Sequence, residues 1–206
     1  MEDINLYERQ DMIVGIKAPK SVSIIGCGGT GTWTGIFLSM MGVKKMNLFD
    51  GDTIEASNLA RLPYSKSSLN RNKAEILKEF IENIRDDMLV FAFPHMDEIS
   101  IGILNEKDSI VFDCTDNAEV QRKVHGYCRE NKIPYQGVHY DGLQVSISDK
   151  PAGWGKGGGY EVTPSWVIPA VLSSLVAVYN QTYSKPYLKK SMTFKSASFN
   201  EILNVK

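Results

Sequence analysis

A short strand that runs straight into a cluster of glycines constrains the fold of this chain more than any other feature. Residues 21–25 (SVSII) are a β-branched run, and a glycine-dense turn over 26–31 follows at once. The sequence then predicts a helix over 32–41 and a second strand over 45–49, which ends at the acidic Asp50. Strand, glycine turn, helix, strand and acid make one β-α-β unit of a parallel sheet.

The remainder of the chain continues this alternation of strands and helices. Apolar residues recur near the helical period over 72–85, which predicts a helix there. Further helices are predicted over 118–131 and 165–183, and further strands over 89–93, 109–112, 135–138 and 142–148. For the polar tail after residue 184, an edge strand and a partly disordered end both stay open. These elements predict an α/β fold with a Rossmann-like, mostly parallel sheet flanked by helices.

We expect residues 1–206 to form a single domain, because a chain of this length fits one. Residues 1–20 would be an N-terminal arm, and the glycine-rich residues 150–164 a flexible crossover loop that leads into the last helix. Within that loop, Trp154 and Lys156 could clamp an incoming peptide tail, and an unstructured connection is an equal alternative.

Net charge and cysteine usage exclude several classes of function. Lys+Arg 23 against Asp+Glu 24 gives a formal charge of -1, which argues against a protein that coats nucleic acid or a membrane surface. The three cysteines form no CxxC pair, so neither a paired-cysteine zinc site nor a disulfide framework is indicated. The charged start over 1–10 does not resemble a signal peptide, and the apolar-rich stretch 166–179 is too short to span a bilayer. We therefore expect no nucleic-acid or membrane partner and a reducing, cytoplasmic compartment.

The glycine turn indicates a nucleotide. Gly26, Gly28 and Gly31 satisfy the pattern G-x-G-x-x-G directly between a strand and a helix. Glycines permit the tight turn and let backbone N–H groups approach a phosphate, to which the helix N-terminus adds partial positive charge. Asp50 lies 19 residues after Gly31, at the end of the next strand, where a carboxylate can hold ribose hydroxyls. This pattern fits NAD, FAD and ATP equally well, and a turn needed only for helix–strand packing would look the same.

Charged residues further along the chain favour ATP among these nucleotides. Arg61 ends the segment GDTIEASNLAR, Lys73 begins the next predicted helix, and Asp116 lies in DCTDN after another strand. Arginine and lysine neutralise a triphosphate, and a carboxylate at the C-terminal end of a strand can hold Mg²⁺, usually with waters. Taken singly, Arg61 and Lys73 also fit ordinary solvated cations, and DCTDN also fits a helix-capping turn.

The order of these motifs resembles the ubiquitin-activating-enzyme-like adenylyltransferases, the ThiF/MoeB group. The resemblance covers residues 5–182 and is carried by the segments ERQ, GCGGTGTW, GVKKMNLFDGD, SNLAR, NRNKAEIL, DCTDN and TPSWVIPAVLSSLVA. It implies a Rossmann variant that forms a homodimer. It also implies an enzyme that uses ATP to form an acyl-adenylate on the C-terminus of a ubiquitin-like sulfur carrier or related peptide, with release of pyrophosphate.

The resemblance also assigns roles to individual residues. Gly28 and Gly29 would line the nucleotide within the turn, and Asp50 would bind the ribose. Asn58, Arg61 and Lys73 would contact the phosphates. Asp116 would hold Mg²⁺ or the surroundings of the attacking carboxylate, and Arg9 would reach the γ-phosphate in the partner subunit of the dimer. A carboxylate substrate is already ionised at neutral pH, so this reaction needs positioning and electrostatic stabilisation but no general base.

The sequence departs from the family pattern at three places. Leu62 stands where the family usually has glutamine after the arginine. The two CxxC pairs that bind structural zinc in many members are absent, so we expect no zinc. The crossover segment 151–165 has no cysteine, and Cys27, Cys114 and Cys128 read as packing residues.

These observations lead to one expected function and two alternatives. The expected function is ATP-dependent adenylation of a carboxylate without a thioester cysteine, with ATP and Mg²⁺ as cofactors. The loss of the loop cysteine and the glutamine supports a non-catalytic, nucleotide-binding partner subunit as one alternative. The glycine turn and Asp50 alone support the other, an NAD-dependent oxidoreductase, which would leave Arg61, Lys73 and Asp116 without a role.

Overall fold

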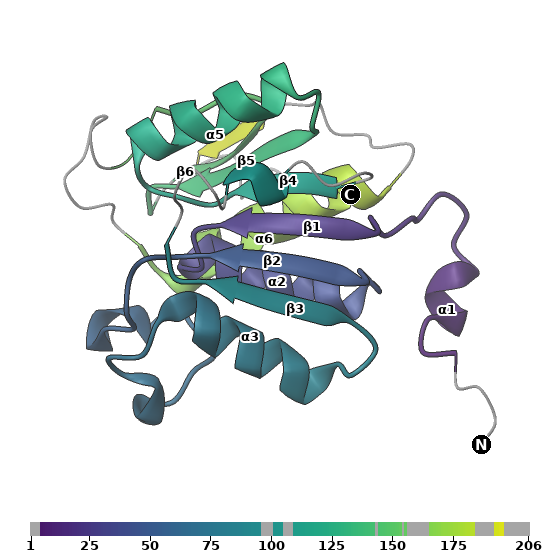
Figure 1. Cartoon of the computed structure of the whole chain (residues 1–206), viewed down its shortest axis with the longest axis horizontal. Coiled ribbons are helices and arrows are strands. Elements are labelled where there is room, and N and C mark those ends of the chain that lie inside the picture. The colour runs from purple at the N-terminus through teal and green to yellow at the C-terminus, as the bar shows by residue number, and fades with distance from the viewer. Residues whose placement is uncertain are drawn as a thin grey trace.

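The computed structural model describes residues 5–95, 101–104, 109–142, 144–153, 155, 165–183 and 192–195. These residues form one sheet with helices on both of its faces (Figure 1). The strands are β1 (Ser21–Ile25), β2 (Lys45–Phe49), β3 (Leu89–Phe93), β4 (Ser109–Asp113), β5 (Tyr135–Tyr140), β6 (Gln144–Ser148) and β7 (Met192–Lys195). The helices are α1 (Glu8–Asp11), α2 (Gly29–Met40), α3 (Lys73–Ile84), α5 (Ala118–Glu130) and α6 (Val167–Thr182), with short 3-10 turns η1 (Ala56–Asn58), η2 (Lys66–Ser68) and η3 (Gly102–Leu104). None of the helices described has the length and apolar character needed to cross a bilayer.

The strand order places a ligand crevice between β1 and β4. The seven strands follow the order β3-β2-β1-β4-β5-β6-β7, with parallel pairing from β3 to β5 and antiparallel pairing of β6 with both neighbours. The chain winds outward from β1 in one direction and from β4 in the other. Ile25 pairs with Phe49 and with Asp113, so β1, β2 and β4 end level with one another. Open parallel sheets bind ligands beyond the carboxyl ends of the strands at such a reversal point. The predicted α/β fold is confirmed. For the tail after residue 184 the sequence left an edge strand as one of two alternatives, and β7 is such a strand.

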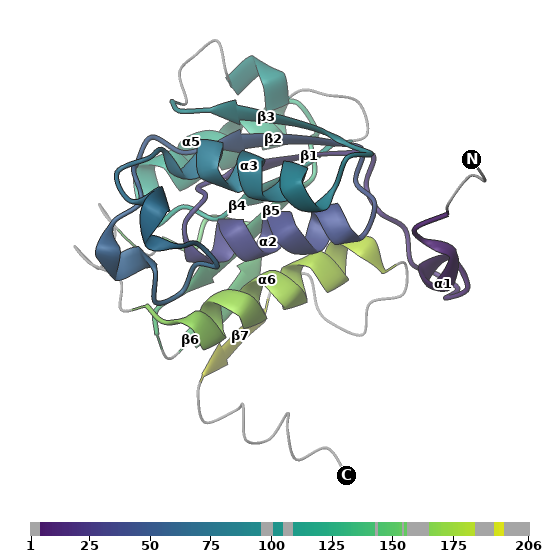
Figure 2. The same cartoon turned by 90° about the horizontal axis from the view of Figure 1, so that it is seen from below.

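Helices bury the sheet from both sides (Figure 2). On one face α2, α3 and α6 pack over the sheet in a core that includes Leu38, Leu77 and Val178. On the other face α5 covers a second core that includes Val124 and Cys128. Because it is covered from both sides, β1 is buried along its whole length, which explains its unbroken β-branched and apolar composition.

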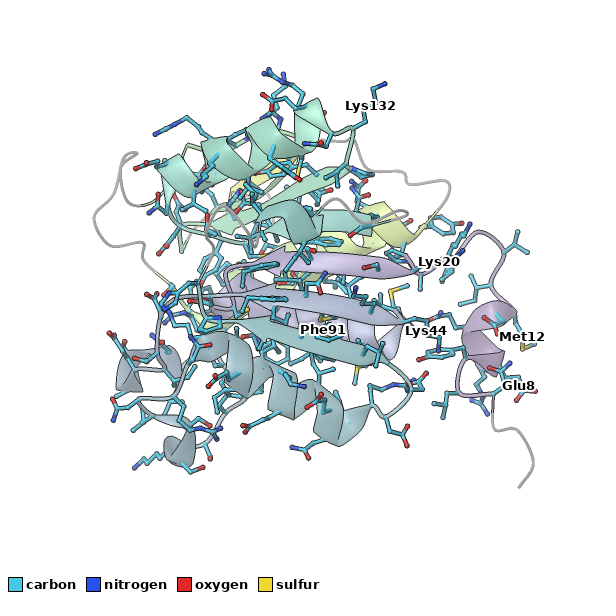
Figure 3. All side chains as sticks on the ribbon, in the orientation of Figure 1. Glu8, Met12, Lys20, Lys44, Phe91 and Lys132 are labelled. Atoms are coloured by element: carbon cyan, nitrogen blue, oxygen red, sulfur yellow. The ribbon has the colours of Figure 1, made fainter. Side chains whose placement is uncertain are left out.

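The N-terminal arm is fixed beside the amino ends of the strands, as Figure 1 shows for α1. The ring of Tyr7 covers Gly42, where a Cβ atom would lie 2.8 Å from the ring. The Tyr7 hydroxyl donates to Asp87 at 3.1 Å, and Lys44 binds the same carboxylate at 2.9 Å. Arg85 contacts both Asp87 and the Tyr7 hydroxyl. Figure 3 shows Lys44 next to α1, so this cluster joins the arm to the start of β2 and the end of α3.

The arm cluster should make stability depend on pH in the acid range. Burial alone would raise the pKa of the Asp87 carboxyl, but hydrogen bonds from Lys44, Arg85 and Tyr7 together lower it. A carboxyl whose pKa is lowered by folding contributes stability above its unfolded pKa of about 3.9 and loses it as pH falls through the lowered value. Asp87→Asn is therefore expected to melt below the wild type near neutral pH, and the difference should shrink as pH falls below about 4. Thermal melts followed by circular dichroism test this, and a difference independent of pH would contradict it.

Candidate functional site

A cavity of about 580 Å³ lies beyond the carboxyl ends of β1, β2 and β4. Its wall brings together segments that are far apart in sequence: the glycine turn, the loop between β2 and α3, and the turn after β4. Seven of the ten residues singled out from the sequence line it, namely Gly26, Gly28, Gly29, Asp50, Arg61, Lys73 and Asp116.

Three glycines of the turn have different physical roles. Gly26 has a φ of 86°, and a Cβ there would lie 3.0 Å from the Cys114 backbone. A Cβ on Gly31 would lie 1.8 Å from the Gly26 carbonyl oxygen, a distance that no side chain tolerates. A Cβ on Gly28 would meet no atom within 4 Å. Gly26 and Gly31 therefore build the turn, whereas Gly28 leaves open space in the cavity wall.

The N-terminus of α2 points its backbone donors at this space. The helix begins at Gly29, earlier than the predicted residue 32, because the glycines of the turn also form its first residues. Gly28 is the N-cap, and no side chain caps this end. The first N–H groups of a helix lack partners inside the helix, and together with the helix dipole they form an anion site. The arrangement suits a phosphate.

Asp50 is held at the end of β2 by two backbone donors. Its Oδ2 accepts from Cys27 N at 2.6 Å and its Oδ1 from Asp52 N at 2.8 Å. Burial raises the pKa of the Asp50 carboxyl, and Lys73 and the two N–H groups counteract part of that rise. The carboxylate is thus fixed in orientation and still lines the cavity, where its remaining lone pairs can accept from hydroxyl groups.

Lys73 is placed by the loop that follows Asp50. Asn72 caps α3 by accepting from Ala74 N and Glu75 N, and its amide donates back to the Asp50 carbonyl at 2.8 Å. Lys73 therefore begins the helix beside that loop, with its Nζ at 2.8 Å from Asp52 Oδ2. The ammonium is mostly buried and Asp52 is exposed, so an anion in the cavity can compete for Lys73.

Arg61 reaches the cavity from the segment after η1. Its Nη1 donates to Ser57 O at 3.0 Å, and Trp33 holds its backbone carbonyl at 2.9 Å. Within the described residues, its buried Nε has no hydrogen-bond partner. The Arg61 Cδ lies close to Gly29, 3.2 Å from where a Cβ would be. A buried guanidinium N–H that lacks an acceptor, next to a helix N-terminus, suits an anionic ligand.

The structure also explains the leucine after this arginine. Leu62 is buried and packs with Ile54 and Ile76 in a small core beneath the segment. Its apolar side chain anchors the backbone that carries Arg61.

The two acidic residues of DCTDN have different surroundings. Asp113 is fully buried, and its carboxylate accepts from Thr115 N at 3.1 Å, from Thr115 Oγ1 at 3.0 Å and from the Tyr135 hydroxyl at 2.8 Å. Asn117 caps α5 by accepting from the N–H groups of Glu119 and Val120. These bonds fix both ends of the turn, and Asp116 between them lines the cavity. Asp113 therefore shapes the turn and Asp116 faces the ligand space.

Three predicted residues lie away from the cavity wall. Gly31 packs inside the turn. Asn58 is buried, and its Oδ1 accepts from Glu55 N at 3.2 Å, which caps η1 and supports the Arg61 segment. Arg9 lies in α1 at the opposite end of the strands (Figure 1).

The comparison with family models agrees with this arrangement: residues 16–187 match the model described as ThiF family. The chain belongs to the ThiF family. The match contains β1, the glycine turn and every cavity residue described above.

Curated relatives of this ThiF chain carry names with different substrates. The molybdopterin-synthase adenylyltransferase of Haemophilus influenzae is 32% identical over 121 residues, which are 58% of this chain and 49% of that protein. The ubiquitin-like modifier-activating enzyme 5 of Xenopus laevis is 31% identical over 123 residues, 53% of this chain and 31% of that protein. The tRNA threonylcarbamoyladenosine dehydratase of H. influenzae is 29% identical over 139 residues, 62% of this chain and 52% of that protein. The chain thus spans about half or less of these relatives.

Solved structures share the fold. E. coli MccB with ATP superposes with a TM-score of 0.74 at 20% identity, over 95% of this chain and 70% of that chain. PaaA superposes with a TM-score of 0.68 at 21% identity, over 85% of this chain and 60% of that chain.

Several cavity residues of the ThiF domain were not predicted. Asp52, Gln121 and Tyr140 line the wall beside the predicted residues. Asp52 stood in GDT next to Asp50, and its acidity was a usable signal. Gln121 and Tyr140 belong to α5 and β5, and they meet the site through tertiary packing that no local spacing reveals. Trp154, Lys156 and most of the predicted crossover loop lie outside the described residues.

All three cysteines of the chain are buried. Burial raises the pKa of the Cys27 thiol well above its usual value, and raises that of Cys114 and of Cys128 to about 12. A thiol of this kind is almost entirely protonated at neutral pH and is a poor nucleophile.

Proposed function

We propose that this ThiF domain binds Mg·ATP in the cavity and transfers the adenylyl group to a carboxylate, with release of pyrophosphate. The observation that carries the proposal is the convergence of Asp50, Arg61, Lys73 and Asp116 around one glycine turn. An NAD site accounts for the turn and Asp50 but leaves two cations and a second carboxylate unexplained.

The residues present fit the nucleotide. Open space at Gly28 and the uncapped start of α2 accommodate phosphates, and the unpartnered Nε of Arg61 provides a donor for them. Asp50 would accept from the ribose hydroxyls. Lys73 would exchange its contact with exposed Asp52 for a phosphate oxygen.

The residues also fit Mg²⁺ as the phosphates would carry it. No group of three or more His, Cys, Asp or Glu side chains gathers as a metal cage in the described part of the chain. Mg²⁺ at nucleotide sites is usually bound by one or two carboxylates, phosphates and waters, and Asp116 would supply such a carboxylate. The ion would neutralise phosphate charge as pyrophosphate leaves. The protein would contribute orientation by Asp50 and charge stabilisation by Arg61 and Lys73.

The proposed acyl substrate is the C-terminal carboxylate of a ubiquitin-like protein or a peptide. Relatives named for molybdopterin synthase and for ubiquitin-like modifiers support it, and MccB, which shares the fold, was solved with MccA. The buried thiols support a product that leaves as the adenylate without a thioester on this chain.

The proposal includes a homodimer because of where Arg9 lies. Its helix and the cavity lie at opposite ends of the strands, so Arg9 does not reach the cavity of its own chain (Figure 1). A second copy would supply Arg9 to this site, and the apolar residues exposed in the arm, Leu6, Met12, Ile13 and Val14, are consistent with a covered surface.

Calorimetric titration with Mg·ATP and with NAD tests the proposal. The wild type is expected to bind Mg·ATP and not NAD, and Asp116→Ala should weaken Mg·ATP binding about tenfold or more, the loss expected when one charged contact is removed. The same variant should bind metal-free ATP almost as the wild type does. Binding of NAD without ATP would contradict the proposal. Binding of Mg·ATP with no adenylation of any carboxylate peptide in a pyrophosphate-exchange screen would favour the non-catalytic partner subunit.

A further inference from the structure

Gln121 connects two parts of the cavity wall that are distant in sequence. It lies on α5 and is fully buried. Its Nε2 donates to the Thr115 carbonyl at 2.9 Å, next to Asp116. Its Oε1 accepts from Gly153 N at 3.1 Å, in the segment that follows β6. One side-chain amide thus joins the turn after β4 to the start of the crossover.

Gly155 makes a second connection between the same two parts. A Cβ on Gly155 would lie 1.7 Å from the Asp116 carbonyl oxygen and 2.7 Å from its Cα. The two backbones are therefore in direct contact, and no side chain fits between them. Gly155 also has a φ of 92°, which favours glycine. Both residues line the cavity.

Several contacts hold the turn after β4. Asp113 and Asn117 fix its two ends through the bonds described above, and His139 hydrogen-bonds to the Thr115 backbone. Gln121 and Gly155 are the contacts that tie Thr115 and Asp116 to the segment after β6. We infer that Gln121 is a positioning residue, which makes the placement of the Asp116 carboxylate depend on the crossover residues Gly153 and Gly155. Displacement of Gly153 and Gly155 displaces Asp116, and a ligand bound at Asp116 holds these two residues in place.

The coupling makes the affinities for the peptide and for Mg·ATP depend on each other. The inference rests on the proposed function for the role of Asp116 toward Mg²⁺. A peptide that displaces residues 153 and 155 changes the affinity for Mg·ATP, and by linkage Mg·ATP changes the affinity for the peptide by the same factor. Gln121 thereby links the nucleotide to the acyl substrate through the Asp116 turn and Gly153.

Two variants test the coupling from opposite sides. Gln121→Leu removes the amide but keeps the volume, and Gly155→Ala pushes against Asp116 from the crossover. Gln136→Leu is the matched control for the first, since Gln136 is also buried, but its amide accepts from Asn180 and Gln181 on α6 and donates to the Gly137 and Ser148 carbonyls. Gly126→Ala is the control for the second, because a Cβ on Gly126 meets no atom within 4 Å.

The first readout is hydrogen exchange of the protein without nucleotide. Exchange is expected to rise over both 113–117 and 152–153 in each test variant and over neither in the controls. A rise over only one of the two segments in either test variant would overturn the inference. Because no nucleotide is present, this result stands whether or not the proposed function is right.

The second readout is the ratio of the ATP dissociation constants without and with Mg²⁺. Both test variants are expected to lower this ratio about tenfold, as loss of one charged contact does, and both controls should keep it. An unchanged ratio in Gln121→Leu, with ATP still bound, would overturn the positioning role. A wild type that binds no Mg·ATP would reject the proposed function, and the exchange data alone would then decide the coupling.

Discussion

Asp50→Asn is expected to weaken the binding of ATP and of adenosine by the same factor, about 10- to 100-fold, because a charge-assisted hydrogen bond contributes about 1.5–3 kcal/mol. The carboxylate accepts from Cys27 N and Asp52 N and keeps lone pairs free toward the cavity. Asparagine has one acceptor oxygen, so either a backbone donor or the ribose loses its partner. Competition against a fluorescent ATP analogue measures both affinities.

Arg61→Ala is the matched control for this effect. It is expected to weaken ATP binding and to leave adenosine binding unchanged, because the Arg61 side chain lies beside the start of α2, where we place the phosphates. Equal losses for both ligands in Arg61→Ala, or a loss for ATP alone in Asp50→Asn, would mean that the ribose and phosphates lie elsewhere in the cavity.

The Asp50 carboxyl should also make the free energy of unfolding depend on pH. Burial raises the pKa of its carboxyl, so the folded protein holds this proton more tightly than the unfolded chain. Stability therefore falls as pH rises from the unfolded value of about 3.9 through the raised value, and the charged form costs stability above it. The stability of Asp50→Asn relative to the wild type should be greater near neutral pH than near pH 4. Hydrogen bonds that the substitution changes should shift the difference in the free energy of unfolding by the same amount at every pH.

The fold could be predicted because its signals are local. The β-branched run before Gly26, the helical period over 72–85 and the acids after the strands each depend on neighbouring residues, and the predicted strands and helices are present. The glycines, Asp50, Lys73 and Asp116 could be proposed for the same reason, since a parallel sheet brings its carboxyl ends to one edge.

The supporting contacts of the site could not be predicted, because they join residues far apart in sequence. Gln121 bridges to Gly153, and Tyr135 reaches Asp113 across neighbouring strands. A buried glutamine on an amphipathic helix carries no sequence mark that separates it from an ordinary polar residue. The same applies to Asn58, which looked like a ligand residue and caps η1 beneath Arg61.

The largest effect on folding is expected from Gly31→Ala. Its Cβ would lie 1.8 Å from the Gly26 carbonyl oxygen and 2.8 Å from the Gly26 carbonyl carbon, so the backbone of the turn or the start of α2 must shift. Gly26 in turn faces the Cys114 backbone and donates to the Phe49 carbonyl at 2.7 Å, which leaves it little freedom to yield. We expect a loss of about 3 kcal/mol or more in the free energy of unfolding, at the upper end for overpacked sites.

Gly28→Ala, three residues earlier in the same turn, should change the free energy of unfolding little but weaken ATP binding. Its φ of -76° is not left-handed and a Cβ there meets no protein atom within 4 Å, so the unfolding midpoint in urea should fall much less than that of Gly31→Ala. The added methyl group would project into the space where we place the phosphates, and ATP affinity should fall at least about tenfold. Urea titration and ATP binding on both variants separate the two roles. If Gly28→Ala binds ATP as the wild type does, the phosphates do not lie against this turn. The hypothesis that the glycine motif binds a nucleotide would then be wrong, although the fold is correct.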